Sequence, residues 1–190
     1  MTTPKILAFA ASTRTGSFNQ QAVEIAAGGA RDAGADVTLL SLADHPLPLF
    51  DQDLEAAEGT PANALALRQI FADHHALLIA SPEYNGFFTP LYKNTIDWLS
   101  RPAGDDAPAP FADKVAAVVA ASPGGLGGLR GIPHARLLLE NLGVLVIPAT
   151  HAAGSAHESL ADPEGRASQG LRDVGAALAR TTAALLGNSA

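Results

Sequence analysis

The segment ASTRTGSFN, residues 11–19, places hydroxyl groups, a guanidinium and a glycine directly before a helical pattern. Hydroxyl groups donate hydrogen bonds to anionic oxygens, a guanidinium matches the geometry of a phosphate, and the first N–H groups of a helix are free to bind an anion. The residues with these properties are Ser12, Thr13, Arg14, Thr15, Ser17 and Asn19. The segment therefore favours a phosphate site, in which Gly16 allows a backbone conformation closed to other residues. The alternative is an ordinary helix cap with additional serines and threonines.

The segment SPEYNGFFTP, residues 81–90, suits the edge of a planar heterocycle better than a phosphate. It combines a rigid proline, an aromatic ring, an amide that both donates and accepts hydrogen bonds, and a flexible glycine. These residues are Pro82, Tyr84, Asn85 and Gly86. Glu83 in the same segment is negative and would repel a phosphate. The alternative is a surface turn whose Phe87 and Phe88 pack in a subunit contact, and both interpretations can hold at once.

The segment SPGGLGGLRGIP, residues 122–133, contains five glycines between Gly124 and Gly131. Backbone N–H groups of glycines can approach a flat, electron-rich ring without a side-chain clash. Arg130 could place a positive charge near such a ring. Taken alone, however, the segment favours the alternative of a flexible lid or a plain turn.

Other motifs that would bind nucleotides, bind metals or supply a nucleophile are absent. The G-x-G-x-x-G spacing fails at Arg130, which argues against a Rossmann dinucleotide fingerprint. The chain contains no G-x-x-x-x-G-K and no G-x-S-x-G, so it lacks a Walker A loop and a nucleophile elbow. His157 and Glu158 lack the second histidine of a zinc-binding helix. We expect structural or solvent-facing roles for all six histidines, and no metal site.

The composition narrows the class of protein. The 190 residues are 47 % hydrophobic and 16 % charged, with a net charge of −7, which is typical of a globular protein and unfavourable for a nucleic-acid surface. There are no cysteines, which excludes disulfides, thiolate zinc sites and dithiol redox chemistry. Any redox reaction must therefore use a bound cofactor. No break in composition marks a boundary, and we predict one domain over residues 1–190.

The first apolar run, residues 6–11, is too short for a targeting or membrane segment. It has six residues, whereas a secretory signal needs an apolar region of roughly 7–15 residues and a membrane span roughly 20. We therefore expect a buried strand, a cytoplasmic protein and no membrane contact.

Continuous apolar runs alternate with helical patterns along the chain. The apolar runs predict strands at 6–11, 37–42, 76–81, 114–122 and 144–149. The helical patterns cover 19–33, 62–75, 90–100, 133–142 and 168–186. Continuous rather than alternating apolar runs are typical of parallel strands that are covered on both faces. The pattern therefore predicts an open, doubly wound sheet with right-handed crossovers.

The predicted fold class is an α/β three-layer sandwich, with a five-stranded parallel sheet in the order 2-1-3-4-5 and helices on both faces. In such a sheet, ligands bind beyond the carboxyl ends of the strands, where the strand order reverses. The three segments described above follow strands one, three and four, which are neighbours in this order, so they should form one continuous rim. Two long loops, 43–61 and 150–167, are expected to be surface or partner-contacting excursions.

The residues of these segments and their spacing resemble those of the NADPH-dependent FMN reductase family, which has a flavodoxin-like fold. The family motifs Ser-x-Arg-x-x-Ser-x-Asn, Pro-Glu-Tyr-Asn, Lys-Asn-x-x-Asp-Trp and Ser-Pro-Gly-Gly are matched at 12–19, 82–85, 93–98 and 122–125. The resemblance runs from the first predicted strand to the fifth. The chain departs from the family at Ala10 and Ala11, where relatives often have a glycine before the serine, and the segment after Ala149 carries no matching motif.

The resemblance implies bound FMN, with the phosphate on the first segment and the isoalloxazine ring between the second and third. The residues that it implies for FMN binding are Ser12, Arg14, Ser17, Phe18, Asn19, Pro82, Glu83, Tyr84, Asn85, Gly86, Ser122, Gly124 and Gly125. It also implies NADPH or NADH as the electron donor, and a homodimer or homotetramer in which a neighbouring subunit helps to wall the flavin site. The acceptor would be a small molecule such as a quinone, a flavin or an azo compound.

The flavin carries the redox chemistry in such a protein, so we predict no catalytic side chain. The alternative function is that of a non-enzymatic FMN electron carrier of the flavodoxin type. The sequence leaves open the physiological acceptor, the choice between NADPH and NADH, and the choice between dimer and tetramer.

Overall fold

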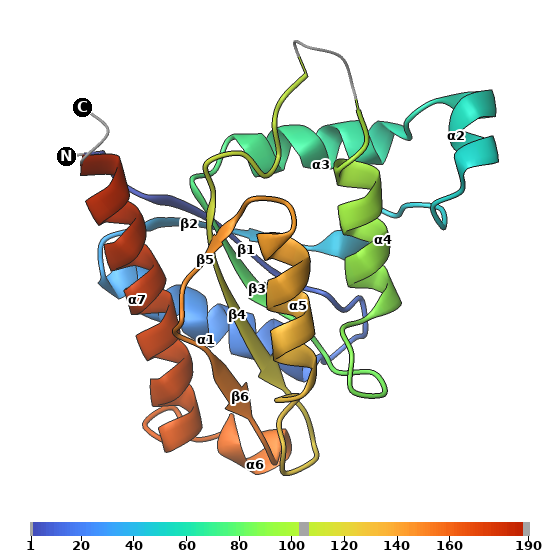
Figure 1. Cartoon of the computed structure of the whole chain (residues 1–190). Coiled ribbons are helices and arrows are strands. Elements are labelled where there is room, and N and C mark those ends of the chain that lie inside the picture. Colours follow the sequence, from blue (N-terminus) through green and yellow to red (C-terminus); the bar gives the residue numbers. More distant parts are fainter. Residues whose placement is uncertain (1, 103–106, 188–190) are drawn as a thin grey trace.

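A parallel β-sheet forms the centre of the computed structural model, which describes residues 2–102 and 107–187 (Figure 1). The predicted domain also includes residues 1, 103–106 and 188–190, which lie outside the described ranges. The main strands have the spatial order β2-β1-β3-β4-β5. Their bounds are Lys5–Ala10 for β1, Asp36–Leu40 for β2, Ala76–Ala80 for β3, Val115–Ala121 for β4 and Leu145–Val146 for β5. This order confirms the predicted flavodoxin-like topology.

The inner strands of the sheet are buried on both faces. Every residue of β3 and β4 is buried, and so is every residue of β1 except Lys5. Successive residues of β1 serve two separate cores, because side chains alternate between the faces of a strand. Ile6 and Ala8 belong to one core, and Leu7 and Phe9 to the other. The continuous apolar runs are thus explained by burial from both sides.

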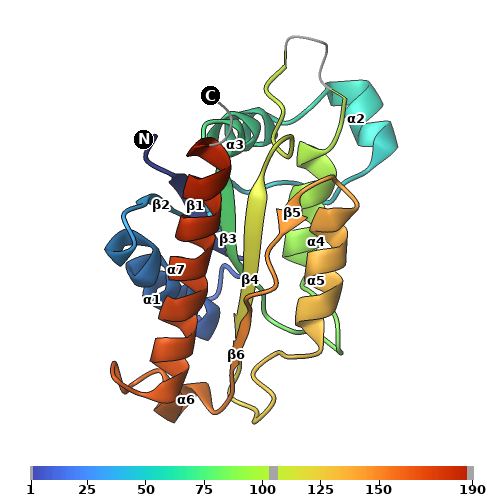
Figure 2. The same ribbon diagram turned by 60° about the vertical axis from the view of Figure 1, so that its left-hand side comes forward.

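Helices cover the two faces of the sheet (Figure 2). On one face lie α1, Phe18–Asp32, and α7, Arg166–Gly187. On the other lie α3, Ala62–Ala72, α4, Pro90–Leu99, and α5, Gly131–Glu140. The five predicted helices correspond to these, with small differences at their ends: α3 stops before residues 73–75, and α5 begins two residues earlier than predicted.

Two glycines allow α1 and α7 to pack unusually close. A Cβ atom at Gly29 would overlap the backbone of Arg172, and a Cβ atom at Gly175 would overlap the carbonyl of Ala26. The neighbouring Gly28 has open space where its Cβ would lie. The close approach of the two helices therefore requires glycine at Gly29 and Gly175, but not at Gly28.

The predicted fifth strand, 144–149, is wrong in extent. The edge of the sheet is made by two short strands, β5 and β6, His151–Ala153, which both pair with β4. Val146 pairs with Ala116 and His151 pairs with Val119, so four residues of this edge, 147–150, lie opposite two residues of β4, 117 and 118. The residues between β5 and β6 include Pro148, which is tolerated at a sheet edge because its missing N–H costs no ladder bond there.

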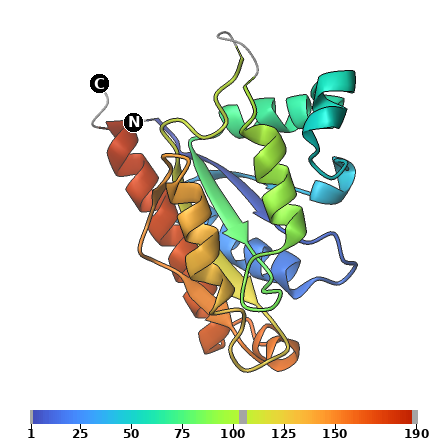
Figure 3. The same ribbon diagram turned by 45° about the vertical axis from the view of Figure 1, so that its right-hand side comes forward.

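The two long loops contain short elements of their own. The 43–61 loop holds most of the 3₁₀ turn η1, Leu42–Asp44, and α2, Gln52–Glu58, which has no buried residue and stands away from the sheet (Figure 3). The 150–167 loop holds β6 and the short helix α6, Ala156–Ser159. Among the helices in the described ranges, none is both long and apolar enough to cross a membrane.

Candidate functional site

The loops that follow β1, β3 and β4 meet at the carboxyl end of the sheet (Figure 3). A cleft of about 440 Å³ lies between them. The predicted binding residues that line it are Ser12, Arg14, Ser17, Phe18, Asn19, Pro82, Glu83, Tyr84 and Ser122. Gly124 and Gly125 line an adjoining cleft of about 350 Å³, which shares Glu83 and Ser122 with the first. Asn85 and Gly86 line neither cleft.

The first loop both caps α1 and leaves free donors for a ligand. Ser17 is the N-cap residue, and its hydroxyl oxygen accepts a hydrogen bond from the N–H of Gln20 at 3.4 Å. Gly16 has a φ of +66°, in the left-handed region that favours glycine. Within the described part of the chain, the N–H groups of Gly16, Phe18 and Asn19 have no hydrogen-bond acceptor. The cap and the anion site are therefore compatible interpretations of the same loop.

Arg14 folds back over its own loop. Its Nη2 donates to the carbonyl of Gly16 at 2.9 Å, and its guanidinium carbon lies 5.5 Å from the centre of the Phe18 ring. The Arg14 backbone N–H donates to the hydroxyl oxygen of Ser12 at 3.3 Å. The only partners of the guanidinium among the described residues are loop carbonyls and an aromatic face, so its charge stays available for an anion in the cleft.

Asn19 ties the first loop to the end of β4. Its Nδ2 donates to the carbonyl of Ala121 at 2.8 Å, and its Oδ1 accepts the N–H of Ala121 at 3.0 Å. The residue is 4 % exposed. Asn19 therefore acts mainly as a support that fixes α1 against β4, with one amide N–H left over for a ligand.

The second loop is a tight hairpin. Tyr84 and Phe87 exchange two backbone hydrogen bonds of 2.8 and 3.0 Å, and both residues between them have positive φ, +54° at Asn85 and +84° at Gly86. Asn-Gly is the preferred pair for such a two-residue turn. The surface turn given as the alternative for this segment is therefore present, with Asn-Gly at its centre. The hairpin leaves Tyr84 57 % exposed at the edge of the cleft.

Glu83 joins the second loop to the third. Its carboxylate accepts hydrogen bonds from Nε of Arg130 at 2.8 Å and from the backbone N–H groups of Arg130 and Gly131 at 2.9 and 3.1 Å. Burial by itself would raise the pKa of Glu83, but these hydrogen bonds and the charge of Arg130 outweigh it and lower the pKa. The carboxylate thus caps the start of α5. The positive charge expected near the ring at Arg130 is engaged by Glu83.

The glycines of the third loop allow close packing against the segment that follows β6. A Cβ atom at Gly127 would overlap the backbone of residues 152–154, and a Cβ atom at Gly154 would overlap the carbonyl of Gly125. The N–H of Ser155 donates to the carbonyl of Gly124 at 3.1 Å. These contacts make the loop a supported wall of the site. Of the two alternatives favoured for the segment alone, a flexible lid or a plain turn, the contacts support the turn.

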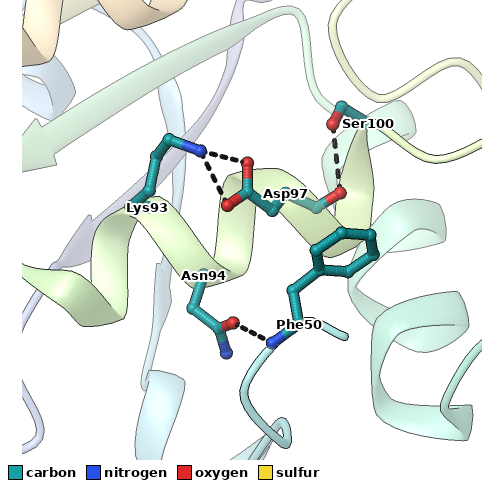
Figure 4. Close-up of polar contacts among 5 residues, drawn as sticks. All are labelled: Phe50, Lys93, Asn94, Asp97 and Ser100. Carbon is teal, nitrogen blue, oxygen red and sulfur yellow. Dashed lines mark hydrogen bonds and ion pairs between the residues drawn. The ribbon is translucent and has the colours of Figure 1, made fainter. Parts of the chain in front are cut away.

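The Lys-Asn-x-x-Asp-Trp motif of α4 lies outside the cleft and holds the loop that follows β2. Oδ1 of Asn94 accepts the N–H of Phe50 at 2.7 Å (Figure 4), and Nδ2 of Asn94 donates to the carbonyl of Pro48 at 2.8 Å. The indole N–H of the buried Trp98 donates to the same carbonyl at 2.8 Å. The motif therefore anchors residues 48–50 to α4.

His157 is a cleft residue that sequence reasoning missed. It lies on α6, in the segment that carries no family motif, and it lines the cleft beside Phe18. No local pattern distinguishes it from the other histidines. It reaches the cleft only because β6 pairs with the carboxyl end of β4 and brings α6 to the same edge.

Comparisons with known proteins agree with this geometry. The profile of the family described as NADPH-dependent FMN reductase matches residues 4–158, which include all three loops. The chain is 35 % identical over 162 residues to an NAD(P)H-dependent FMN reductase of Pseudomonas aeruginosa, covering 85 % of this chain and 83 % of that protein. It is 31 % identical over 160 residues to a quinone reductase of Escherichia coli K12, covering 84 % and 82 %.

A solved structure shares the fold. A flavoenzyme NAD(P)H:(acceptor) oxidoreductase from Paracoccus denitrificans superposes with a TM-score of 0.71 at 23 % identity, over 94 % of this chain and 98 % of that one.

Proposed function

The chain belongs to the NADPH-dependent FMN reductase family, and from this premise we propose that it binds FMN in the loop cleft and passes electrons from NAD(P)H to a small quinone-type acceptor. Membership of this family makes the protein an FMN-dependent oxidoreductase that uses NAD(P)H, which favours an enzyme over a flavodoxin-type electron carrier. The observation that carries the proposal is the convergence of the three loops on one cleft.

The donors of the first loop fit a phosphate monoester. The N–H groups of Gly16, Phe18 and Asn19 have no acceptor among the described residues, and they stand at the start of a 15-residue helix whose dipole favours an anion. Arg14 adds a positive charge, and Ser12 adds a hydroxyl group. The proposed phosphate site therefore offers several hydrogen-bond donors and no carboxylate.

The second and third loops fit the flat end of FMN. Pro82 and Tyr84 form one side of the cleft, and Ser122 with the glycine segment forms the other. A Cβ atom built at Gly125 would meet no atom within 4 Å, so the backbone there is open to a planar ring. The N–H groups of Gly124 and Gly125 have no acceptor among the described residues. We assign these two groups to the ring, where they would stabilise negative charge.

When bound, FMN supplies the two-electron chemistry, and the chain supplies binding, orientation and electrostatics. Glu83 and Arg130 hold the two ring-binding loops together, and Asn19 fixes the phosphate-binding loop against β4. No side chain is required as a general acid or base. Tyr84 presents an exposed aromatic face at the rim, which suits stacking against a planar acceptor such as a quinone.

We assign the exposed apolar side chains of the second and third loops to a contact with a second copy of this chain. Phe87, Leu126 and Leu129 are each between 50 % and 55 % exposed. Large apolar side chains exposed on neighbouring loops are typical of protein–protein contacts. Light scattering after gel filtration tests this assignment, and a monomer at micromolar concentration in the FMN-bound state would contradict it.

The proposed activity is tested with purified protein, FMN, NADPH or NADH, and benzoquinone as the acceptor. We expect nicotinamide oxidation that depends on both protein and acceptor. Nicotinamide oxidation that is no faster than the oxidation caused by free FMN would contradict the proposal. Azo dyes and free flavin replace benzoquinone in parallel assays to define the acceptor class.

The phosphate assignment is tested separately by FMN titration. Arg14→Ala should weaken FMN binding by roughly 10-fold or more, because a charge-assisted hydrogen bond contributes about 1.5–3 kcal/mol. Arg14→Lys keeps the charge and should recover part of the affinity. An unchanged dissociation constant for FMN in Arg14→Ala would show that Arg14 does not bind the phosphate.

A further inference from the structure

His157 lies in a firmly supported position at the edge of the cleft. It is carried by α6, and the N–H groups of Ser155 and Ala156 donate to the carbonyls of Gly124 and Ser122, both at 3.1 Å. Ala156 is buried, at 1 % exposure. The imidazole is thus presented by a segment that is bonded to the third loop, although the side chain itself is exposed.

The imidazole of His157 and the guanidinium of Arg14 both contact the ring of Phe18. The His157 ring meets the Phe18 ring edge-on, with centroids 4.6 Å apart and an interplanar angle of 79°. The Arg14 guanidinium lies 5.5 Å from the centre of the same Phe18 ring. Phe18 is the first residue of α1, next to the helix cap Ser17. Two side chains with N–H donors therefore converge on the start of α1, from segments about 140 residues apart.

The donors of His157 are not used by the protein. Its imidazole makes no hydrogen bond to any of the described residues, and the only contact of the ring that the structure shows is with Phe18. An imidazole always carries at least one N–H, and its charged form carries two. A phosphate held at the N-terminus of α1 would offer acceptor oxygens within the cleft that His157 lines.

We propose that His157 is a further phosphate-binding residue, which donates a hydrogen bond to the phosphate of FMN. The inference rests on the proposed function, because it requires FMN in this cleft. It adds a donor that lies outside the four family motifs and that comes from the C-terminal third of the chain. The Phe18 ring contacts both the imidazole and the guanidinium.

The test measures FMN binding to the full chain by quenching of flavin fluorescence, together with the ³¹P resonance of bound FMN. His157→Ala should weaken binding by roughly 10-fold, the loss expected for one hydrogen bond to a charged group, and should move the ³¹P resonance. His157→Gln keeps an N–H donor and should recover part of the affinity. His45→Ala, on the loop after η1, is the matched control and should bind FMN like the wild type.

The outcomes separate this inference from the proposed function. A wild-type protein that does not bind FMN would overturn both. A wild type that binds FMN, with a His157→Ala variant of equal affinity, would overturn only the role of His157. A loss of affinity without any change in the ³¹P resonance would also overturn it, because the effect would then come from packing against Phe18. Thermal melting followed by circular dichroism verifies that each variant is folded.

Discussion

The hydroxyl group of Thr89 donates a hydrogen bond to the carbonyl of Ala11 at 2.9 Å, which joins the end of the loop after β3 to the start of the loop after β1. The same oxygen accepts the N–H of Tyr92 at 3.2 Å and so caps α4. Thr89 and Ala11 are both almost fully buried. One side chain thus sets the relative position of two loops that are separated by more than sixty residues of sequence.

Thr89→Val should lower the free energy of unfolding by about 1–3 kcal/mol. The substitution keeps the shape of the side chain, but it leaves the Ala11 carbonyl and the Tyr92 N–H without their partner, and an unsatisfied buried polar group carries a cost of this size. Urea unfolding followed by circular dichroism measures the change. FMN affinity should fall as well, because the two loops lose their common support. Thr89→Ser keeps the hydroxyl group and should lie nearer the wild type; a Ser variant as unstable as the Val variant would mean that packing, and not the hydrogen bonds, explains the effect.

Substitution of two adjacent glycines of α1 should have opposite effects. Gly28→Ala should raise the free energy of unfolding by about 0.5–1 kcal/mol, because the site is open and alanine is the better helix former. Gly29→Ala should lower it by about 1–3 kcal/mol, because the added methyl group overlaps the backbone of Arg172 and must push α7 away from α1. Thermal melting of the two variants side by side provides the measurement. Equal shifts of the melting temperature would contradict the close contact of α1 with α7.

The stability of the protein should fall as the pH drops below about 6.5, in part because of His75. Burial first, and then the positive charges of Lys114, Lys5 and His74, lower the pKa of His75. Its Nδ1 accepts the N–H of Lys5 at 3.0 Å, which a protonated ring cannot do. The unfolded chain therefore takes up a proton at a higher pH than the folded chain, so the stabilisation is complete above the ordinary histidine pKa and is lost as the pH falls below it.

The measurement for His75 is urea unfolding at pH 7.5 and at pH 5.5. His75→Asn supplies an acceptor that does not titrate, so the difference in stability between the two pH values should shrink. His45→Asn is the control, since the His45 imidazole makes no hydrogen bond to the described residues. If His75→Asn and the wild type lose the same stability between the two pH values, His75 is not the responsible group.

Asn94→Ala should release the loop that follows β2. The variant loses the hydrogen bonds to Phe50 and Pro48, of 2.7 and 2.8 Å, and one such bond is enough to change a local opening equilibrium about 10-fold. Chymotrypsin cleavage after Phe50, followed by mass spectrometry, measures the opening. Lys93→Ala is the matched control on the same helix, because Lys93 pairs only with Asp97 among the described residues, at 2.5 Å and one turn away (Figure 4). Equal cleavage of Asn94→Ala and Lys93→Ala would show that Asn94 does not hold the loop.

The parts of the fold that depend on local patterns were predictable. The buried strands β3 and β4 appeared as continuous apolar runs, and the βα alternation with the right-handed crossover rule predicted an open, doubly wound sheet. The predicted order 2-1-3-4-5 is one of the orders that such a sheet adopts, and the structure confirms it. The division of the last strand into β5 and β6 was not predictable, because an apolar run that contains Pro148 does not reveal where the pairing is interrupted. That interruption depends on which residues of β4 are free to pair, which only the assembled sheet decides.

The candidate site, like the fold, could be predicted from the sequence only in part. The residue types in the three loops, and the rule that ligands bind at the carboxyl edge of a parallel sheet, led to the cleft. The roles of single residues within it did not follow. The resemblance implies FMN binding by Glu83, but the carboxylate oxygens of Glu83 accept hydrogen bonds from Arg130 and Gly131. The Lys-Asn-x-x-Asp-Trp motif on α4 matches the family, and the structure shows that its Asn94 and Trp98 hold a neighbouring loop.

By itself, the sequence determined the family resemblance, the alternation of strands and helices and the chemistry that each loop can offer, because these properties reside in short segments and in their order along the chain. The tertiary structure decided which polar groups form hydrogen bonds within the protein and which remain available to a ligand. Asn19 and Ala121 are 102 residues apart and use most of each other's hydrogen-bonding capacity. His157, in contrast, lies at the same cleft and makes no hydrogen bond to any of the residues that the structure describes. The physical reason is that a polar group becomes available or engaged only through its neighbours in space, and those neighbours come from strands and helices that are distant in sequence.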